Sequence, residues 1–393
     1  MKRILFAAVF FLHLSPILVS QIITGAMRTD AYFPLLGDRR IAVVANNNST
    51  LPALSGKGTV NLIDTLVNSG FRLVKIFSPE HGFRGHAEAG ELVVDTTDPV
   101  TGIPVVSLYG NHKKPRPEEL DGIKLVIFDL QDVGVRFFTY LSTLTYVMES
   151  CAALDIPVLL LDRPNPNGDY IDGPVLEKEY TSFVGLHPVP VVYGMTIGEY
   201  ARMVNGEGWL KDKLKCKLEV IPLVGYTHSL RFVSVGLPSP NLPTMNAIRL
   251  YPSLCFFEGT TVSVGRGTDY PFEVFGYPDP ATGSFSFVPH SIPGKSLHPP
   301  FEGIRCYGSD LRNNEFTGNE QGRINLFYLL TTYKILGSKT DFFTSYFALL
   351  AGTDRLRQQI IKGLSEQEIR ESWREGIMMF RKIRSQYLIY PEN

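Results

Sequence analysis

The sequence has no excess of either charge. Lysine and arginine total 38 and aspartate and glutamate 39, so the formal net charge is −1 at neutral pH. Without Lys2 and Arg3 the cationic total is 36 against 39 acidic residues, a net charge of −3. Nucleic-acid-binding proteins carry clustered basic residues, and this chain has no basic run. The composition therefore argues against a nucleic-acid partner.

Cysteine is also scarce, with four residues in the chain and no C-x-x-C pair. The spacing gives no support for a structural zinc site, and we expect no bound metal. Cys151 lies in a segment predicted to be helical and Cys255 in the apolar run SLCFF, where buried free thiols are common. We expect all four to be free and buried: Cys151, Cys216, Cys255 and Cys306.

The glycine-rich fingerprint of dinucleotide-binding proteins is missing. In those proteins G-x-G-x-x-G follows the first strand of a parallel sheet. Here the first apolar strand, residues 40–45, runs into NNNSTLPALSGKG. We therefore expect no nicotinamide or flavin, and no other cofactor is indicated.

The first 20 residues, MKRILFAAVFFLHLSPILVS, combine a basic pair with an apolar stretch and small residues. This pattern is typical of a secretory signal peptide. His13, Ser15 and Pro16 interrupt the apolar stretch and no stop-transfer pattern follows it, so we do not expect a retained membrane helix. We expect an exported protein, periplasmic or secreted, with no stable membrane insertion after cleavage.

Short apolar runs alternate with amphipathic helical segments between residues 38 and 225. Continuous apolar runs separated by helices are typical of parallel strands that are buried on both faces of a sheet. We therefore predict an α/β fold, with a Rossmann-like catalytic domain over residues 21–235. The predicted strands are 40–45, 73–77, 105–108, 125–130 and 158–161, and the predicted helices are 60–68 and 141–154.

A proline-rich stretch, GLPSPNLP at 236–243, marks the predicted domain boundary, because it cannot lie inside a helix or a central strand. Beyond it, mixed patterns predict a smaller C-terminal α+β domain over 236–393. Its first segment carries Glu258 and Arg266 among glycines, so we expect this domain to close over a crevice of the first one. The predicted helices of the second domain are 321–336, 341–349 and 366–384.

Three predicted strands end in polar motifs: SPEHGFRG at 78–85, DLQDVGVRFFTY at 129–140 and DRPNPNGD at 162–169. Ligands of open parallel sheets bind in the crevice beyond the carboxyl ends of the strands. We therefore expect the three motifs to meet at one edge of the sheet. Residues 77–91 are the richest segment, with two histidines and three glutamates among glycines, so they offer groups for proton transfer.

Several charged groups in these motifs have both a chemical and a structural interpretation. Glu80 lies at a strand exit, where partial desolvation raises a carboxyl pKa and suits a general acid; the alternative is an ion pair with Arg84. Asp129 lies inside an apolar strand and needs a ligand, a cation or a hydrogen-bond donor. Asp132 and Arg136, four residues apart, suit either an ordinary ion pair or the capture of a carboxylate.

Taken together, these segments resemble a family of exo-acting β-N-acetylmuramidases that trim peptidoglycan fragments and were long catalogued as a domain of unknown function. The resemblance implies a Rossmann-like catalytic domain, a smaller C-terminal domain and release of N-acetylmuramic acid from non-reducing ends. It also implies a catalytic glutamate in the strand-exit motif, which is Glu80 here. It covers nearly the whole chain after residue 20, through SPEHGFRG (78–85), AGE (89–91), SLYG (107–110), DLQDVGVRFFTY (129–140), DRPNP (162–166), PSPNLP (238–243) and CFFEGTTVSVGRGT (255–268).

The residues fit such a reaction. A glycosidase needs an acid to protonate the leaving oxygen, and either a second carboxylate or the 2-acetamido group of the substrate to meet the developing positive charge. Glu80 takes the acid role. The candidates for the partner are Asp129, Asp132 and Glu258, and the sequence does not choose among them.

Muramic acid also carries a lactyl carboxylate, which calls for an arginine in the crevice. Arg136 is the first choice, followed by Arg84 and Arg266. Tyr140 is expected to stack on the sugar, together with Phe138. The other residues expected to contact the saccharide are His81, Gln131, Arg163, Asn165, Asn241 and Thr268.

Two other classes of function remain open. A metal-dependent hydrolase would use Glu80, His81, Asp129 and Asp132 as ligands, although the chain has no HxH or HExxH spacing. A non-catalytic exported sugar-binding protein would share the two lobes and the cleft but would not turn over substrate. Hydrolysis of a chromogenic muramic acid glycoside, with and without a chelator, distinguishes the three.

Overall fold

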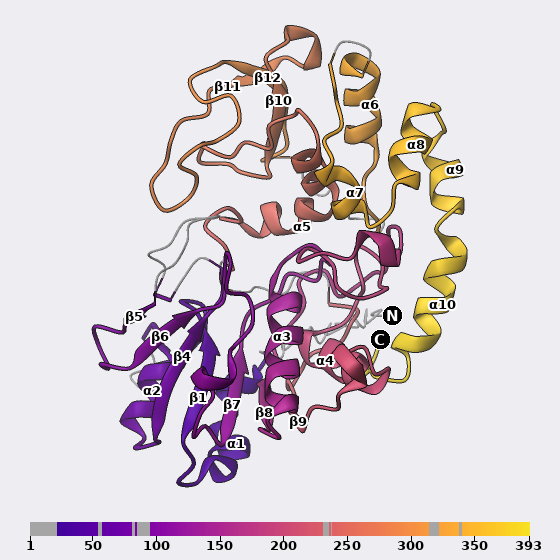
Figure 1. Cartoon of the computed structure of the whole chain (residues 1–393). Helices are drawn as coiled ribbons and strands as arrows, with labels where there is room; N and C mark the ends of the chain where they lie inside the picture. The colour runs from indigo at the N-terminus through magenta and orange to yellow at the C-terminus, as the bar shows by residue number, and fades with distance from the viewer. Residues whose placement is uncertain are drawn as a thin grey trace, which may run out of the picture.

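The structure is a computed structural model that describes residues 22–53, 57–80, 83–84, 95–230, 236, 238–313, 322–337 and 340–393. Figure 1 shows a lower lobe built on a sheet, a smaller upper lobe, and the last helices running along one side of both. In the described ranges, no helix has the length and apolar character needed to cross a membrane. Residues 1–20 lie outside these ranges, so the signal peptide stays a prediction.

The lower lobe contains a seven-stranded sheet. Its strands are β1 (Ile41–Ala45), β4 (Leu73–Ser78), β5 (Thr96–Thr97), β6 (Pro104–Ser107), β7 (Leu125–Asp129), β8 (Val158–Leu161) and β9 (Leu218–Ile221). They are arranged β5-β6-β4-β1-β7-β8-β9, and only the pair β5 and β6 is antiparallel. Counted along the chain without β5, the parallel strands follow the order 3-2-1-4-5-6 of the Rossmann fold. The predicted fold class is confirmed.

Helices cover both faces of this sheet. One face carries α1 (Thr29–Leu36) and α2 (Leu62–Asn68), and the other carries α3 (Tyr140–Ala153) and α4 (Ile197–Gly206). Within β1, Ala42 and Val44 pack with α3 and α4, whereas Ile41 and Val43 pack with α1 and α2. Because both sets of side chains are buried, the strand contains no polar residue, as is typical of a covered parallel sheet.

The predicted strands and helices of this lobe agree with the structure to within two residues at each end. The four cysteines are free and buried, as expected. The prediction missed α1, α4, β5 and β9, and also a small two-stranded sheet of β2 (Thr50–Pro52) and β3 (Thr59–Asn61). For α4 the sequence held a signal, because Thr196 and Glu199 form a capping box at its start.

The upper lobe is α+β, as predicted. Its small antiparallel sheet has the order β10-β12-β11, with β10 (Val274–Tyr277), β11 (Phe285–Phe287) and β12 (Cys306–Asp310). The predicted helix 366–384 is in fact two helices, α9 (Glu366–Glu371) and α10 (Arg374–Arg384). The other helices are α5 (Met245–Leu254), α6 (Phe327–Leu336), α7 (Tyr346–Ala351) and α8 (Arg355–Ile361). The position of the domain boundary near residue 235 stays a prediction.

The end of the chain returns to the lower lobe, as α10 shows in Figure 1. The Arg384 guanidinium donates two hydrogen bonds to the carbonyl of Gly194, at 2.8 and 2.7 Å. The Tyr390 hydroxyl donates to the buried carboxylate of Asp162 at 2.5 Å, and the Tyr390 amide donates to Glu199 at 3.2 Å. The last residues therefore stabilise the lobe that the first half of the chain forms.

Candidate active site

One carboxylate is held between two hydroxyl groups at the carboxyl edge of the sheet. Glu80 follows β4 and Tyr109 follows β6, its parallel neighbour. Thr139, just before α3, donates its hydroxyl to Glu80 Oε2 at 2.8 Å. The Tyr109 hydroxyl bonds to the same carboxylate, and burial together with Glu80 raises the pKa of Tyr109, so this hydroxyl keeps its proton. Glu80 itself is half-buried.

Arg266 and Glu258 come to the same place from the upper lobe. Arg266 Nε donates to Glu258 Oε1 at 2.5 Å, and the guanidinium lies 5.2 Å from the centre of the Phe272 ring. The side chains of Arg266 and Glu258 remain 23% and 20% exposed. Although burial alone lowers it, the pKa of Arg266 is raised overall by the Glu258 carboxylate, so the guanidinium is charged.

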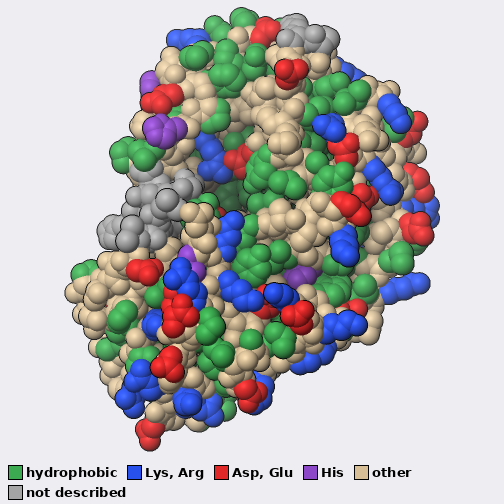
Figure 2. Space-filling model, in the orientation of Figure 1, with side chains coloured by type: hydrophobic (Ala, Val, Ile, Leu, Met, Phe, Trp, Pro, Cys, Tyr) green, Lys and Arg blue, Asp and Glu red, His purple; other side chains and the backbone are tan. Residues whose placement is uncertain are grey.

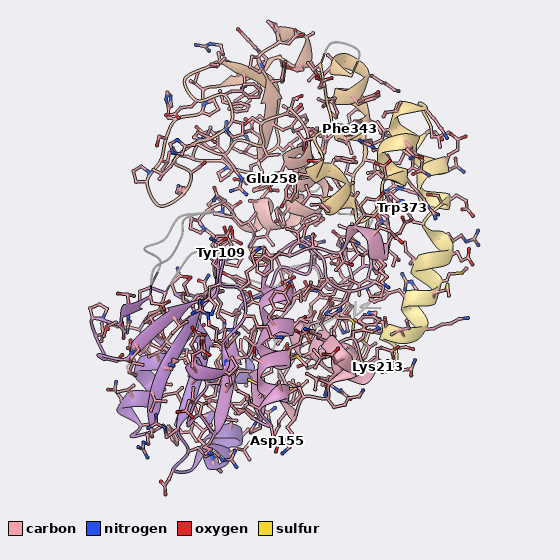
Figure 3. All side chains as sticks on the ribbon, viewed as in Figure 1. Tyr109, Asp155, Lys213, Glu258, Phe343 and Trp373 are labelled. Atoms are coloured by element: carbon pink, nitrogen blue, oxygen red, sulfur yellow. The ribbon has the colours of Figure 1, made fainter. Side chains whose placement is uncertain are left out.

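The views of the whole molecule agree with this placement. Figure 3 shows Tyr109 and Glu258 on opposite sides of the space between the lobes. Figure 2 shows that the surface is hollowed there and that cationic and anionic side chains lie in the hollow. Glu80 and Arg266 line a cavity of about 60 Å³ between the lobes. The wall of this cavity also contains Asn241 and four aromatic rings, from Phe137, Phe138, Tyr251 and Phe272.

Tyr140 is buried beside the loop that lines this cavity. The sequence had suggested instead that Tyr140 faces the sugar. Tyr140 is only 1% exposed. Its hydroxyl donates to the carbonyl of Pro238 at 3.1 Å and accepts from Asn46 Nδ2 at 2.8 Å. The expectation of sugar stacking is therefore corrected for Tyr140, whereas Phe138 does line the cavity.

Asp129 and Arg163 are bound to each other. Arg163 Nε and Nη2 donate to the two carboxylate oxygens of Asp129 at 2.5 and 2.8 Å, and both side chains are buried. The charge that an apolar strand cannot bury alone is thus paired with a cation from the loop after β8. Neither residue lines the cavity, so the structure gives them a bracing role and not the catalytic and sugar-binding roles expected.

Asp132 and Gln131 stabilise the loop that follows β7. Asp132 is buried, and its Oδ2 accepts from the Tyr193 hydroxyl and from the Gly134 amide, the latter at 2.6 Å. Burial raises the pKa of Asp132 to about 6. Gln131 Nε2 donates to the carbonyls of Asp132 and Pro164 at 2.7 and 2.8 Å. Asp132 does not pair with Arg136, and the catalytic role expected of Asp132 is not supported by this geometry.

Arg136 links the two lobes and is not exposed to the cavity. Its two Nη groups donate to four backbone carbonyls and only 1% of the residue is exposed. The acceptors are Pro174 and Val189 of the lower lobe, at 2.9 and 2.7 Å, and Leu350 and Ala351 of α7, at 2.9 and 2.8 Å. Burial lowers the pKa of Arg136 to about 9, which still leaves it charged at neutral pH. The expectation that Arg136 binds the lactyl carboxylate is wrong, because every Nη hydrogen bond is directed to the protein itself.

The Arg84 guanidinium is also bound by carboxylates of the protein. It donates to Asp98 and to Asp64, each at 2.7 Å, so it is neither a simple partner of Glu80 nor free to bind a substrate carboxylate. The carboxylates and the guanidinium form a local network beside the site.

Of the remaining residues expected to contact the saccharide, some are bound within the fold and others line the cavity. Asn165 Nδ2 donates to the carbonyl of Met195 at 2.7 Å and Thr268 Oγ1 to that of Gly265 at 2.7 Å, so both are bound within the fold. Asn241 and Arg266 line the cavity, and their contact with a saccharide stays a prediction. His81 lies outside the described residues. Among those described, no three His, Cys, Asp or Glu side chains gather in an arrangement that holds a metal ion.

Comparison with known proteins identifies the family of this chain. Residues 41–246 match the N-terminal domain described as exo-β-N-acetylmuramidase NamZ, and residues 249–390 match its C-terminal domain. The chain belongs to the NamZ family.

One relative of this NamZ family member is the peptidoglycan β-N-acetylmuramidase NamZ of Bacillus subtilis (strain 168). The two are 37% identical over 376 residues, which cover 91% of this chain and 89% of that protein. Two DUF1343 family proteins from Bacteroides fragilis NCTC 9343 have similar crystal structures. One is 44% identical with a TM-score of 0.86 and covers 95% of this chain and 100% of that one. The other is 27% identical with a TM-score of 0.77, over 94% and 99% of the two chains.

Sequence reasoning missed three hydroxyl groups of this NamZ site. Tyr109 follows a parallel strand, so the rule that identified Glu80 would also have found it. Thr139 lies inside the motif 129–140, but the prediction from this motif used mainly its charged residues. Tyr346 has its pKa raised by burial and then by Cys255 and by the carboxylates Glu258 and Glu80, so it lies near the site. It comes from α7, far along the chain, and no local pattern indicated it.

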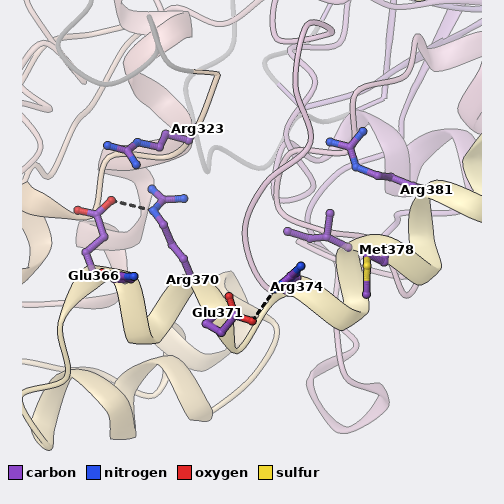
Figure 4. A pocket seen from close by; sticks show the side chains of 9 residues that line it. Arg323, Glu366, Arg370, Glu371, Arg374, Met378 and Arg381 are labelled. Atoms are coloured by element: carbon purple, nitrogen blue, oxygen red, sulfur yellow. Dashed lines mark hydrogen bonds and ion pairs between the residues drawn. The ribbon is translucent and has the colours of Figure 1, made fainter.

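A larger hollow of about 680 Å³ lies along α9 and α10 (Figure 4). Two of its arginines pair with glutamates of α9: Arg370 of the same helix with Glu366 at 2.8 Å, and Arg374 of α10 with Glu371 at 3.1 Å. No strand-exit residue lines it. Because size alone does not indicate chemistry, we assign the active site to the smaller cavity, where unlike charges meet strand ends.

Proposed function

We propose that this protein is an exo-acting β-N-acetylmuramidase that releases N-acetylmuramic acid from the non-reducing ends of peptidoglycan fragments, with Glu80 as the general acid. Membership of the NamZ family supports the activity. The observation that carries the acid assignment is the position of Glu80, half-buried at a strand exit and lining the cavity between the lobes. Thr139 and Tyr109 hold its carboxyl group in place.

In this reaction Glu80 protonates the glycosidic oxygen as the bond to the anomeric carbon breaks. Of the three candidate partner carboxylates, Asp129 and Asp132 are buried and bound, and only Glu258 reaches the cleft. Glu258 already accepts from Arg266, so the positive charge at the anomeric carbon is met either by Glu258 or by the 2-acetamido group. Turnover by Glu258→Gln separates these two routes, because the acetamido route does not need the Glu258 carboxylate as a nucleophile.

Arg266 takes the role of binding the lactyl carboxylate. It lines the cavity and, in the described part of the chain, only its Nε has an acceptor, which is Glu258. Both Nη groups are therefore left to donate to a substrate, and paired donation from one guanidinium is the arrangement that carboxylates favour. Arg136 and Arg84 lack such free donors.

The deciding experiment is hydrolysis of a chromogenic N-acetylmuramic acid glycoside by Glu80→Gln. The substitution keeps the shape of the side chain and removes its proton, so turnover should fall about 10²-fold or more. Binding of N-acetylmuramic acid should survive, and Glu118→Gln, at an exposed position, serves as the matched control. Wild-type turnover of a substrate with a poor leaving group by the Glu80 variant would show that Glu80 is not the acid.

The same assay addresses the other two classes of function. Activity should persist in excess chelator, and its loss there would favour the metal-dependent hydrolase. Binding of the sugar without any turnover by the wild-type chain would favour the non-catalytic protein.

We also propose export to the periplasm or beyond the cell. The support is the basic and apolar pattern of residues 1–20, together with a substrate that lies outside the cytoplasmic membrane. N-terminal sequencing of the protein from separated cell fractions tests this. A full-length chain confined to the cytoplasm would contradict it.

A further inference from the structure

Asn241 lines the cavity, and one of its side-chain atoms is a buried hydrogen-bond acceptor that has no partner in the described residues. The residue is 2% exposed, and its Nδ2 donates to the carbonyl of Lys295 at 2.9 Å. Because a carbonyl only accepts, this contact fixes which end of the amide is the nitrogen. The other end, Oδ1, is buried and has no hydrogen-bond partner within the described residues. A buried acceptor that receives no hydrogen bond destabilises the protein, so the position calls for a donor from outside.

Hydrogen bonds also fix the backbone turn that carries Asn241. The Asn241 amide donates to Ser239 Oγ at 3.2 Å, and the Leu242 amide donates to the Ser239 carbonyl at 3.0 Å. The preceding residue, Pro238, accepts from the Tyr140 hydroxyl. The loop and the Lys295 contact thus fix the orientation of the acceptor before any ligand arrives.

The cavity has the size and lining for a small substituent that carries both a donor and an apolar end. Its volume is about 60 Å³. This is several times the ~10–15 Å³ that one water needs, so the cavity has room for a group of a few atoms. Its lining combines four aromatic residues, Phe137, Phe138, Tyr251 and Phe272, with polar groups.

We infer that this cavity receives the 2-acetamido group of the substrate, with the amide N–H donating to Asn241 Oδ1 and the methyl group packing on the aromatic wall. The inference rests on the proposed function. It places three residues of one cavity beside three successive carbons of the sugar: Glu80 at the anomeric carbon, Asn241 at the second and Arg266 at the lactyl ether of the third. Asn241 is thereby a specificity-determining residue for the N-acetyl group.

The test compares two chromogenic glycosides that differ in one group: N-acetylmuramic acid, and its analogue in which a 2-O-acetyl ester replaces the amide. The ester keeps the methyl and the carbonyl but has no N–H. The wild-type protein should prefer the amide, and Asn241→Leu should reduce that preference by about 5-fold to 150-fold, the range expected when a buried N–H loses its acceptor. The ratio of the two kcat/KM values does not depend on the folded fraction of the variant, and the comparison isolates the coupling between Asn241 and the N–H.

Asn205→Leu is the matched control. Asn205 lies in α4, and its amide exchanges two hydrogen bonds with the Cys216 backbone, at 2.9 and 2.8 Å. The Asn205→Leu variant should be less stable than the wild type but should keep the preference for the amide substrate. An unchanged preference in Asn241→Leu would overturn the inference while leaving the proposed function intact.

Binding measured in parallel keeps the two proposals separate. If the wild-type protein hydrolyses neither glycoside, the proposed function fails. In that case binding decides the inference. The ratio of the affinities for N-acetylmuramic acid and for its 2-O-acetyl analogue should fall in Asn241→Leu by the same factor. Equal ratios in the two proteins would reject it.

Discussion

Arg136 and Arg266 carry the same side chain into two different regions of the molecule. Arg136 lies in the contact between the lobes, is 1% exposed, and gives its Nη hydrogen bonds to four backbone carbonyls. The Arg266 side chain lies at the cleft, is 23% exposed and donates to one carboxylate. Asp129 and Glu80 differ in the same way, since one is enclosed by a cation and the other is half-buried between hydroxyls. The difference is thus one of exposure: Arg136 and Asp129 are enclosed by the protein, whereas Arg266 and Glu80 keep part of their surface open at the cleft.

The strongest test of this difference is Arg136→Met. It removes a donor from four buried carbonyls, of which, among the described residues, only that of Val189 keeps another, the Leu176 amide at 3.1 Å. It also removes a polar contact between the lobes, so the free energy of unfolding should fall by about 3–5 kcal/mol. Chemical denaturation measures this, with Arg312→Met as the control, because the pair of Arg312 with Asp310 is partly exposed and contributes about 1 kcal/mol or less. A stable Arg136 variant that loses only its activity on muramic acid would restore the sequence-based prediction.

Asp132→Asn tests whether a buried carboxyl beside the site is structural. Burial raises the pKa of Asp132 from 3.8 to about 6, so the folded state binds this proton more tightly than the unfolded state. Its contribution to stability is therefore full below about pH 4 and is lost as the pH rises through about 6, an effect of roughly 3 kcal/mol at most.

Unfolding free energies of wild type and Asp132→Asn measured from pH 4 to pH 8 give the comparison. The variant should lack the decline between pH 4 and pH 6, because asparagine stays neutral. The buried Asp162, whose pKa is raised to about 7 by desolvation, contributes to both proteins and cancels. Parallel curves would show that Asp132 does not titrate in this range.

Arg266→Met is the counterpart of the first substitution at the cleft. It should lower kcat/KM on the muramic acid glycoside by about 10-fold to 150-fold, since a charge-assisted contact contributes about 1.5–3 kcal/mol. The much weaker reaction on the N-acetylglucosamine analogue, which lacks the lactyl ether, should change little. Equal losses on both substrates would make Arg266 a partner of Glu258 alone.

Thr139→Val should have the smallest effect. It removes one donor to Glu80 while preserving the shape of the side chain, so kcat should fall by roughly fivefold, the equivalent of about 1 kcal/mol, with little change in KM. Thr139→Ser keeps the hydroxyl and should restore the rate. If the serine variant is as slow as the valine variant, packing of the Thr139 methyl group, and not the hydrogen bond, accounts for the loss.

The sequence predicted the sheet and the position of Glu80 at a strand exit, because both depend on local pattern. Strands, helices and the residues at the carboxyl ends of strands can be predicted from residues that are close in the chain. Whether a charged group is free depends on distant residues. Arg136 is bound by carbonyls as far away as Ala351, and Asp129 by Arg163 from the next strand exit. Tyr346 reaches the site from α7, again through tertiary packing that no local spacing encodes.

The return of the C-terminal tail to the lower lobe affects the order in which this protein is completed during synthesis. The sheet lobe leaves the ribosome first, but Asp162 and Glu199 lack the donors of Tyr390 until residue 390 has been translated. Contacts that span so much of the chain close late in folding. A chain cut before Tyr390 would therefore hold a Rossmann-like lobe in which Asp162 and Glu199 lack these two donors. We expect such a chain to be degraded faster than the uncut chain, although every residue of the cleft is present.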